Sequence, residues 1–411
     1  MRRLFANKGF TLVEMIVVMA LFVIVIAITG NAFNLIVSKA LSLSRTAESN
    51  ISGIVGLEIM RSDLASAGYG LAWSFSAPIN YQEATGDPGV ALNDANRIYQ
   101  TTVDPDQSQQ NIPRAVMSTD NVVSANNAVV MNGTDVLTVR SQTIATNATA
   151  KRWTYVESAV LPTVNPSSTP HVWSSDNLQP TDRVVVIEPV AATKPTNQLV
   201  VNASTSAWTA TFSKYSTIGK PPVYNDAEGK SDAYVIYGVD GDTDLRMPFN
   251  RADFYVRQPA AGEWGWIRLP ARCNPATGVL FKGVVSQSSG GYALELPLLE
   301  CVLDMQVVYG ILPPGSTTIT YQSDISGFTP KMVREQVKEI KTFILTHDGG
   351  KDSGYTYPNS TIGVGPGDGR TSGTGRTYDF VANNVPNWQN YHWHVYQITA
   401  RPNNLAGNVA Q

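Results

Sequence analysis

The longest apolar run in the chain lies close to its N-terminus. The residues from Phe10 to Ile28 include a single charged side chain, Glu14. A helix of this length spans about 28 Å, enough to cross the hydrocarbon core of a bilayer. A carboxylate inside such a helix costs about 2.5–3.5 kcal/mol on insertion scales. The pattern therefore predicts a membrane-spanning helix in which Glu14 has a specific role.

The helical pattern continues beyond the membrane segment. Apolar residues go on recurring every three or four positions, and Gly68-Tyr69-Gly70 is typical of a helix C-terminus. We expect one helix over 10–67, membrane-spanning over 10–28 and amphipathic over 29–67. The alternative is an anchor followed by a separate helix, with a break at Gly30. The predicted stripe comprises Ile36, Ala40, Leu43, Ala47, Ile51, Ile54, Leu57, Met60 and Leu64.

After residue 70 the pattern changes to short runs of β-branched and aromatic residues between turn residues. Three of these runs begin with a hydroxyl residue followed by Asp, at Thr134, Thr181 and Ser231, which is typical of a turn that leads into a strand. Apolar spacing predicts one short helix over Met332–Ile340. Further strands are predicted at Asp253–Val256, Val279–Val284, Tyr292–Leu296, Val302–Tyr309, Lys341–Thr346 and Tyr391–Arg401.

These elements predict an α+β fold, in which a long N-terminal helix packs on a large, mostly antiparallel β-rich ectodomain. The chain of 411 residues is too long for one ordinary compact domain beyond the helix. Gly219-Lys-Pro-Pro222 and Asn225-Asp-Ala-Glu-Gly229 are interpreted as a connection, so the ectodomain is one domain or two that divide near residue 225. The expected parts are a leader (1–9), the helix (10–67), a first ectodomain part (68–225) and a second (226–411).

Composition and charge narrow the function classes. Apolar residues make up 43% of the chain and charged residues 15%, which indicates a folded protein. The net charge is −3 and no basic block follows the leader, so we expect no nucleic-acid partner. Basic residues before position 9 place the N-terminus in the cytoplasm and everything after Ile28 outside. In an oxidising periplasm Cys273 and Cys301 would form one disulfide; the alternative is two unrelated buried thiols.

The run Lys8-Gly9-Phe10-Thr11-Leu12-Val13-Glu14 resembles the processing site of type IV pilins and their relatives. The resemblance implies that a prepilin peptidase cuts after Gly9 and N-methylates Phe10. Glu14 would be the family's fifth-position acid, and the new Phe10 amine would neutralise Glu14 of a packed neighbour. The chain lacks the proline that often kinks this helix in the family. An ordinary secretory signal would be cleaved after the apolar core, where residues 27–30 are a weak match.

A narrower resemblance lies further along the chain. The segment from Leu299 to Gly310 is similar to the signature segment of PilW-type minor pilins. The segments from Ser231 to Gly238 and from Ile398 to Leu405 resemble two further elements of that family. Residues 75–130 and 350–385 carry no resemblance. The chain is also long for the family, so we expect extra loops or an inserted subdomain.

Three acids suggest a cation site. Asp240, Asp242 and Asp244 have the spacing of the first three ligands of an EF-hand calcium loop. Leu245 and Arg251 stand where that loop requires Gly and Glu. A weak extracellular calcium site therefore competes with a plain Asp-Gly turn that carries a solvated acidic tip. No other cofactor is indicated.

The C-terminal region is rich in histidine and aromatic residues. His392 and His394 would share one face of a strand, but a zinc site there lacks a third ligand. We expect the neighbouring aromatic side chains to pack in the protein or to line a contact surface. They are Trp388, Tyr391, Trp393 and Tyr396.

The remaining motifs do not indicate catalysis. The glycine-rich run from Gly363 to Arg376 lacks the lysine of a phosphate-binding loop and is interpreted as a long flexible surface loop. No nucleophile elbow, zinc-protease motif or Cys–His pairing is present, and the chain has four histidines. We expect that the protein is not an enzyme.

The first functional expectation is a minor type IV pilin that inserts its helix into the pilus at or near the tip and helps to prime assembly. Its expected partners are prepilin peptidase, the major pilin, other minor pilins and a PilY-type tip adhesin. It would be a single-pass inner-membrane protein with a periplasmic ectodomain, and extracellular after assembly. The alternatives are a minor pseudopilin of type II secretion and a pilus-borne adhesin or binding module whose exposed aromatics stack on carbohydrate or single-stranded DNA. Buried C-terminal tryptophans would remove the best evidence for the last alternative.

Overall fold

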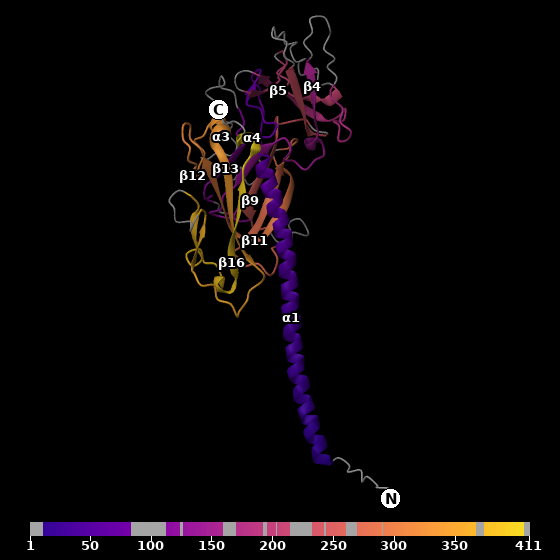
Figure 1. Ribbon diagram of the computed structural model, residues 1–411, viewed down its shortest axis with the longest axis vertical. Helices are drawn as coiled ribbons and strands as arrows, with labels where there is room; N and C mark the ends of the chain where they lie inside the picture. The colour runs from indigo at the N-terminus through magenta and orange to yellow at the C-terminus, as the bar shows by residue number, and fades with distance from the viewer. Residues whose placement is uncertain are drawn as a thin grey trace. The chain divides into compact units, whose positions relative to one another are not determined.

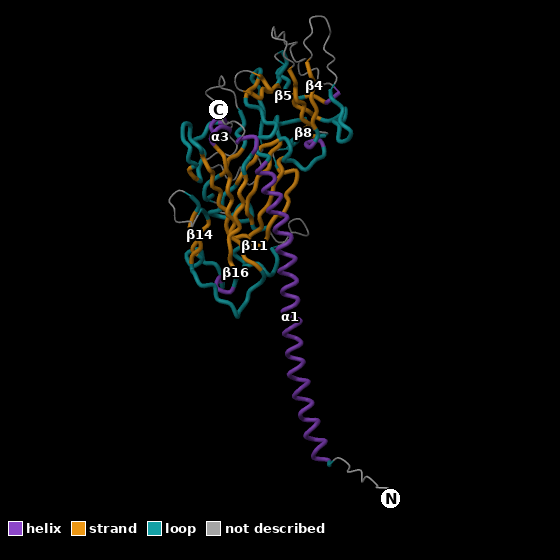
Figure 2. Tube along the Cα trace, in the orientation of Figure 1, coloured by secondary structure: helices purple, strands orange, loops and turns teal. Residues whose placement is uncertain are grey.

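The computed structural model divides into two compact units, Met1–Ile51 and Ser52–Gln411. We call the second the β-rich unit, since strands and loops dominate it after the helix (Figures 1 and 2). The structure describes residues 11–83, 112–123, 126–158, 170–191, 195–202, 204–213, 232–241, 244–259, 269–289, 291–366 and 374–406.

A single helix, α1 (Leu12–Ala65), begins the described chain. The predicted continuity is confirmed, and the alternative break at Gly30 is wrong. The helix ends two residues before the predicted Ala67, because the chain enters a turn in which Gly68 has a φ of +80°. The predicted helix at 332–340 is instead α3 (Pro330–Gln336), which ends where the backbone becomes extended. The other helical segments are η1 (Thr149–Lys151), η3 (Trp388–Asn390) and α4 (Asn403–Ala406).

Two sheets and one hairpin make up the strands, and every pair is antiparallel except β1 with β6. Sheet A has the order β1 (Ser74–Phe75), β6 (Pro195–Leu199), β5 (Arg183–Ala191), β8 (Asp232–Asp240) and β4 (Trp153–Ser158), with β7 (Ala210–Thr211) on β5. Sheet B has the order β16 (His392–Ala400), β13 (Val337–Asp348), β11 (Tyr292–Ile311), β10 (Gly278–Val285), β9 (Asn250–Arg257), β3 (Leu137–Ser141) and β2 (Val116–Ser118), with β12 (Thr320–Gln322) on β11. The hairpin is β14 (Thr361–Val364) and β15 (Arg376–Asp379). The α+β expectation is confirmed.

The connection expected near residue 225 does not separate the two sheets. Strand β8 follows that point in the chain but pairs with β4 and β5, which precede it. Strand β3 precedes it but pairs with β9, which follows it. Each sheet therefore takes strands from both sides of residue 225.

Two segments that were predicted to interrupt the strands contribute residues to strands. The strands expected at 292–296 and 302–309 form one strand, β11, with an irregular register between Val302 and Asp304 next to Cys301, whose φ is +58°. The glycine-rich run expected as a loop contributes its two ends to β14 and β15. Arg376 holds the second of these strands in place, because its Nε donates to buried Asp304 Oδ2 at 2.7 Å. The middle of the run lies outside the described residues.

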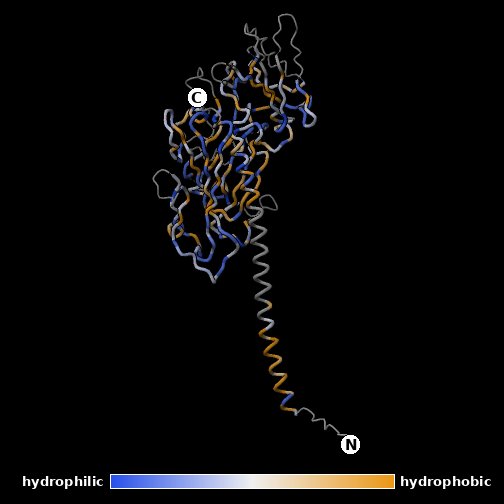
Figure 3. Tube along the Cα trace, in the orientation of Figure 1, coloured by the Kyte–Doolittle hydropathy of each residue, from blue (hydrophilic) through white to orange (hydrophobic). Residues whose placement is uncertain are grey.

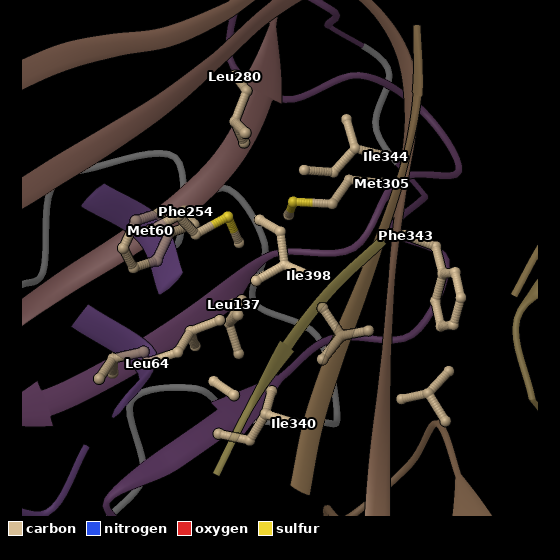
Figure 4. Packing of buried hydrophobic residues seen from close by; sticks show 14 of the residues in the cluster. Met60, Leu64, Leu137, Phe254, Leu280, Met305, Ile340, Phe343, Ile344 and Ile398 are labelled. Carbon is tan, nitrogen blue, oxygen red and sulfur yellow. The ribbon is translucent and has the colours of Figure 1, made fainter. Parts of the chain in front are cut away.

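The core of sheet B lies under the last turns of α1. Met60 and Leu64 are fully buried and point toward Leu137 and Phe254 (Figure 4). The predicted stripe is confirmed at these two positions and at Leu57, whereas Ile54 is 60% exposed. The side chains of the earlier stripe residues, from Ile36 to Ile51, lie outside the described set.

The face of α1 that contacts sheet B contains Gly53 and Gly56 and not the predicted Ile54. A Cβ on Gly53 would lie 2.7 Å from Leu299 Cδ1, and a Cβ on Gly56 would overlap the Leu298 carbonyl group. Positions 53, 56, 60 and 64 follow helical spacing, so they form one face toward sheet B, with Gly53 and Gly56 next to β11. The helix approaches the strand closely because this face has no side chain at two positions.

We expect Gly56→Ala to destabilise the protein by about 1–3 kcal/mol, because the new methyl group has to displace backbone atoms of β11. The measurement is the urea midpoint of the full-length protein in detergent micelles. Gly30→Ala is the matched control: nothing lies within 4 Å of its added Cβ, and alanine is the better helix former. An unchanged midpoint for Gly56→Ala would contradict the close approach.

A buried ion network joins Glu83, which precedes sheet B in the chain, to strands β3 and β9 of that sheet. Glu83 Oε2 accepts from Arg140 Nη2 of β3 and from Arg251 Nη1 of β9, each at 2.8 Å. Arg251 also binds Asp253, with 2.7 Å between Nη2 and Oδ2. All four side chains are at most 3% exposed. Charges this deeply buried are stable only when they are paired, so the network fixes the segment at Glu83 against the sheet.

Candidate functional site

The start of α1 is a reciprocal cap. Thr11 N donates to Glu14 Oε2 at 2.9 Å, and Glu14 N donates to Thr11 Oγ1 at 3.3 Å. Thr11 Oγ1 also donates to the same Oε2 at 3.0 Å. This Thr-x-x-Glu arrangement is a capping box, which satisfies backbone donors that the first helical turn leaves unpaired. The motif is readable in the sequence, and it gives Glu14 an intrahelical role in addition to the intermolecular role expected for it.

An apolar segment follows the cap without interruption. Residues Leu12–Gly30 have a mean hydropathy of 2.9, and none of them is buried (Figure 3). A helix of 19 such residues is long enough to cross a membrane. Its exposed apolar surface matches a lipid or protein environment and not water.

Glu14 is an anion placed at the end of this apolar surface. Both of its capping contacts use Oε2, and among the residues that the structure describes none contacts Oε1. The cap supplies part of the polar environment that a carboxylate loses on entering lipid. The arrangement leaves an acceptor that a cation on a neighbouring helix would bind strongly. Gly9 and Phe10, the predicted cleavage and methylation residues, lie outside the described residues.

The two cysteines expected to pair are joined. Cys273 and Cys301 form a disulfide with a Cα–Cα distance of 4.9 Å, and both are nearly inaccessible. The bond ties the turn before β10 to the centre of β11.

The predicted calcium loop is only partly visible. Asp240 ends β8, Asp242 lies outside the described residues, and Asp244 Oδ1 is 2.7 Å from Arg183 Nη2. In the described part of the chain no cluster of three metal-binding side chains occurs. Asp244 thus forms an ion pair with an arginine of β5.

The C-terminal aromatic residues belong mainly to the protein interior. Trp393 and Tyr391 are 5% and 6% exposed. Trp388 is partly buried and stacks on the fully buried Phe380 with 5.4 Å between ring centroids. The expected evidence for a binding surface here was a set of exposed C-terminal tryptophans. Their burial removes that evidence. His392 stacks on Tyr355 at 3.8 Å, and among the described residues it belongs to no group of three metal-binding side chains.

A different aromatic cluster was missed in the sequence. Trp153 and Tyr155 alternate on β4, and His171 and Trp173 follow in a segment that packs beside them. The alternation of Trp153 and Tyr155 was a readable signal of a strand with one aromatic face.

Comparison with known proteins agrees with the N-terminal site. Residues 4–30 match the family model described as the prokaryotic N-terminal methylation motif. No curated protein and no solved structure matches the chain significantly. The matched segment includes the cap and the whole apolar segment Leu12–Gly30. Together with the apolar helix it supports a type IV pilin-like or pseudopilin-like protein that is processed by prepilin peptidase and anchored in a membrane.

Proposed function

We propose that this protein is a minor type IV pilin of the PilW type, with a structural and not a catalytic role. The observation that carries the proposal is the methylation motif at 4–30, with its acid inside an apolar helix. Before assembly the helix would hold the β-rich unit on the periplasmic side of the inner membrane. After assembly the unit would be part of an extracellular pilus, together with the major pilin, other minor pilins and a PilY-type tip adhesin.

Cleavage after Gly9 would create the cation that Glu14 needs. The new α-amine of Phe10 is positively charged at neutral pH, and the Glu14 carboxylate is its natural partner on an adjacent helix. The capping box survives the cut, because Thr11 keeps its backbone N–H. Oε2 would thus continue to cap the helix while Oε1 binds the amine of the neighbour. An unpaired charge in an apolar bundle is costly, so the pair would set the axial register of an incoming subunit.

The size of the β-rich unit favours a scarce subunit over a repeating one. It spans Ser52–Gln411 and contains both sheets. A body of this size at every position would crowd its neighbours along a shaft, whereas a tip has room for it. We therefore place the protein at or near the tip, where it would help to prime assembly.

Glu14→Ala is expected to leave membrane insertion intact and to lower recovery in sheared filaments by about tenfold or more, because the Phe10 amine of a neighbour loses its partner. Quantitative immunoblots of membrane and filament fractions measure both quantities. Glu58→Ala is the matched control, since Glu58 is an exposed acid of the same helix outside the apolar segment. Equal recovery of Glu14→Ala and wild type would refute the proposed role of Glu14.

Mass spectrometry of the N-terminal peptide tests the proposal as a whole. We expect N-methylated Phe10 at low stoichiometry in sheared surface filaments. Methylated Phe10 confined to the membrane fraction would instead indicate a pseudopilin of type II secretion. An uncut N-terminus in both fractions would overturn the pilin proposal.

A further inference from the structure

Four aromatic rings form a cluster at the end of sheet A. Trp153 and Tyr155 come from β4, the last strand in the order of that sheet. The Trp153 and Trp173 rings lie 4.9 Å apart and tilted, whereas Tyr155 and His171 stack in parallel at 4.8 Å. The His171 and Trp173 rings meet edge-on at 4.5 Å, which connects the two pairs. The cluster is thus one continuous aromatic surface.

Backbone hydrogen bonds hold this surface in place. His171 N donates to Tyr155 O at 2.9 Å, and Trp173 Nε1 donates to Trp153 O at 2.7 Å. Asn177 bonds both backbone groups of Trp173, with its Oδ1 accepting from Trp173 N and its Nδ2 donating to Trp173 O. The rings are therefore ordered before any ligand arrives, which lowers the entropy cost of binding.

Two of the four rings, those of Trp153 and Trp173, line a pocket. A pocket of about 280 Å³ is bounded by Trp153 and Trp173 and by the polar residues Lys151 and Ser174–Asp176. Trp153 is 37% exposed, and in the described part of the chain none of the four rings packs in a buried hydrophobic cluster. The pocket volume is slightly below the range typical of small-molecule pockets, which is about 300–1,000 Å³.

The lining chemistry matches a sugar ring. A pyranose has an apolar C–H face, which stacks on the negative face of an aromatic ring, and a rim of hydroxyl groups. Asp176 would accept hydrogen bonds from the sugar hydroxyls, and the two serines could donate or accept them. Lys151 would donate to the oxygens of the sugar. The carboxylate of Asp176 would repel a phosphate or another anion, which disfavours nucleic acid.

We infer that the pocket lined by Trp153 and Trp173 is a binding subsite for one neutral pyranose unit of a glycan. The inference does not depend on the filament role, because it rests only on Lys151 at the end of η1, on β4 and on the segment that follows β4. It assigns the β-rich unit a ligand-binding function at a place distinct from the C-terminal aromatics.

A glycan array tests the inference on the full-length protein. The protein is kept in an amine-oxide detergent, because a sugar headgroup would compete for the site. The array carries neutral hexose and N-acetylhexosamine oligosaccharides, and the strongest hit is titrated by calorimetry. We expect binding to at least one neutral glycan and a loss on the order of tenfold for Trp153→Ala, because one stacking ring is removed. Asp176→Ala should weaken the same glycan through lost hydrogen bonds.

Two features of the variants separate binding from folding. Trp153→Ala keeps the backbone carbonyl that accepts from Trp173 Nε1, so the segment retains its anchor. Tyr321→Ala is the matched control, since Tyr321 is also 37% exposed but lies on β12 of sheet B. It should bind like wild type, and equal thermal midpoints establish that each variant is folded.

Three results would overturn the inference. The first is that wild type binds no neutral glycan above the Trp153→Ala background. The second is that Trp153→Ala and wild type bind with equal affinity. The third is that a twelve-nucleotide oligothymidylate binds more strongly than any glycan. If Trp153→Ala does not fold, the exposed Asp176→Ala decides between the same outcomes. None of these results depends on incorporation into filaments, so failure here and failure of the proposed function are distinguishable.

Discussion

Replacing Glu83 by alanine is expected to lower the free energy of unfolding by about 3–5 kcal/mol, because it leaves two buried cations with one anion fewer. Arg140 and Arg251 stand directly opposite each other on β3 and β9, and Glu83 Oε2 lies 2.8 Å from both. Like charges that face each other across a strand pair destabilise it, and burial strengthens the repulsion. Urea unfolding of the full-length protein in micelles measures the loss.

Graded variants test whether charge is the cause. Glu83→Gln keeps the shape of the side chain but removes its charge, so we expect a loss smaller than that of alanine. Glu58→Ala removes an acid whose partner, Arg61, is exposed, and should leave the free energy of unfolding nearly unchanged. A Glu83→Ala variant as stable as Glu58→Ala would contradict the account of the buried network.

Removing the disulfide is expected to cost about 3–4 kcal/mol. Cys273 and Cys301 are 28 residues apart in sequence, and a cross-link that closes a loop of this length restricts the unfolded chain by about that amount. The double variant Cys273→Ser/Cys301→Ser should therefore unfold at a lower urea concentration than wild type.

Chemical reduction provides an independent control. The chain has two cysteines, so a thiol reductant acts on this one bond. Reduced wild type should unfold at the midpoint of the double variant, and reductant should not change the double variant itself. A double variant as stable as oxidised wild type would show that the bond contributes nothing to stability.

Local features of the fold were predictable from the sequence. The continuity of α1 followed from unbroken helical spacing, and strands such as β5 and β10 followed from their β-branched runs. Both signals depend on residues within a few positions of each other. The face of α1 was harder to predict at Ile54, because Gly53 and Gly56 have no side chain to mark the position where the helix approaches β11.

Long-range features were not predictable. Strand pairing joins residues on both sides of residue 225, so the two sheets do not divide at that point of the chain. The hydropathy pattern marks Trp153 and Trp393 equally as apolar, yet the first is partly exposed beside a pocket and the second is in the core. Which aromatic residue is buried depends on the neighbours that the fold supplies.

The N-terminal site of this protein is determined by the sequence alone, because its cleavage motif, its capping box and its apolar segment all lie within residues 4–30. A helix brings residues three or four positions apart together without help from the rest of the chain. Only the tertiary structure decided that Glu83 lies between two opposed arginines and that Trp153 and Trp173 share one pocket. Those arrangements depend on contacts between distant segments, which no local pattern specifies.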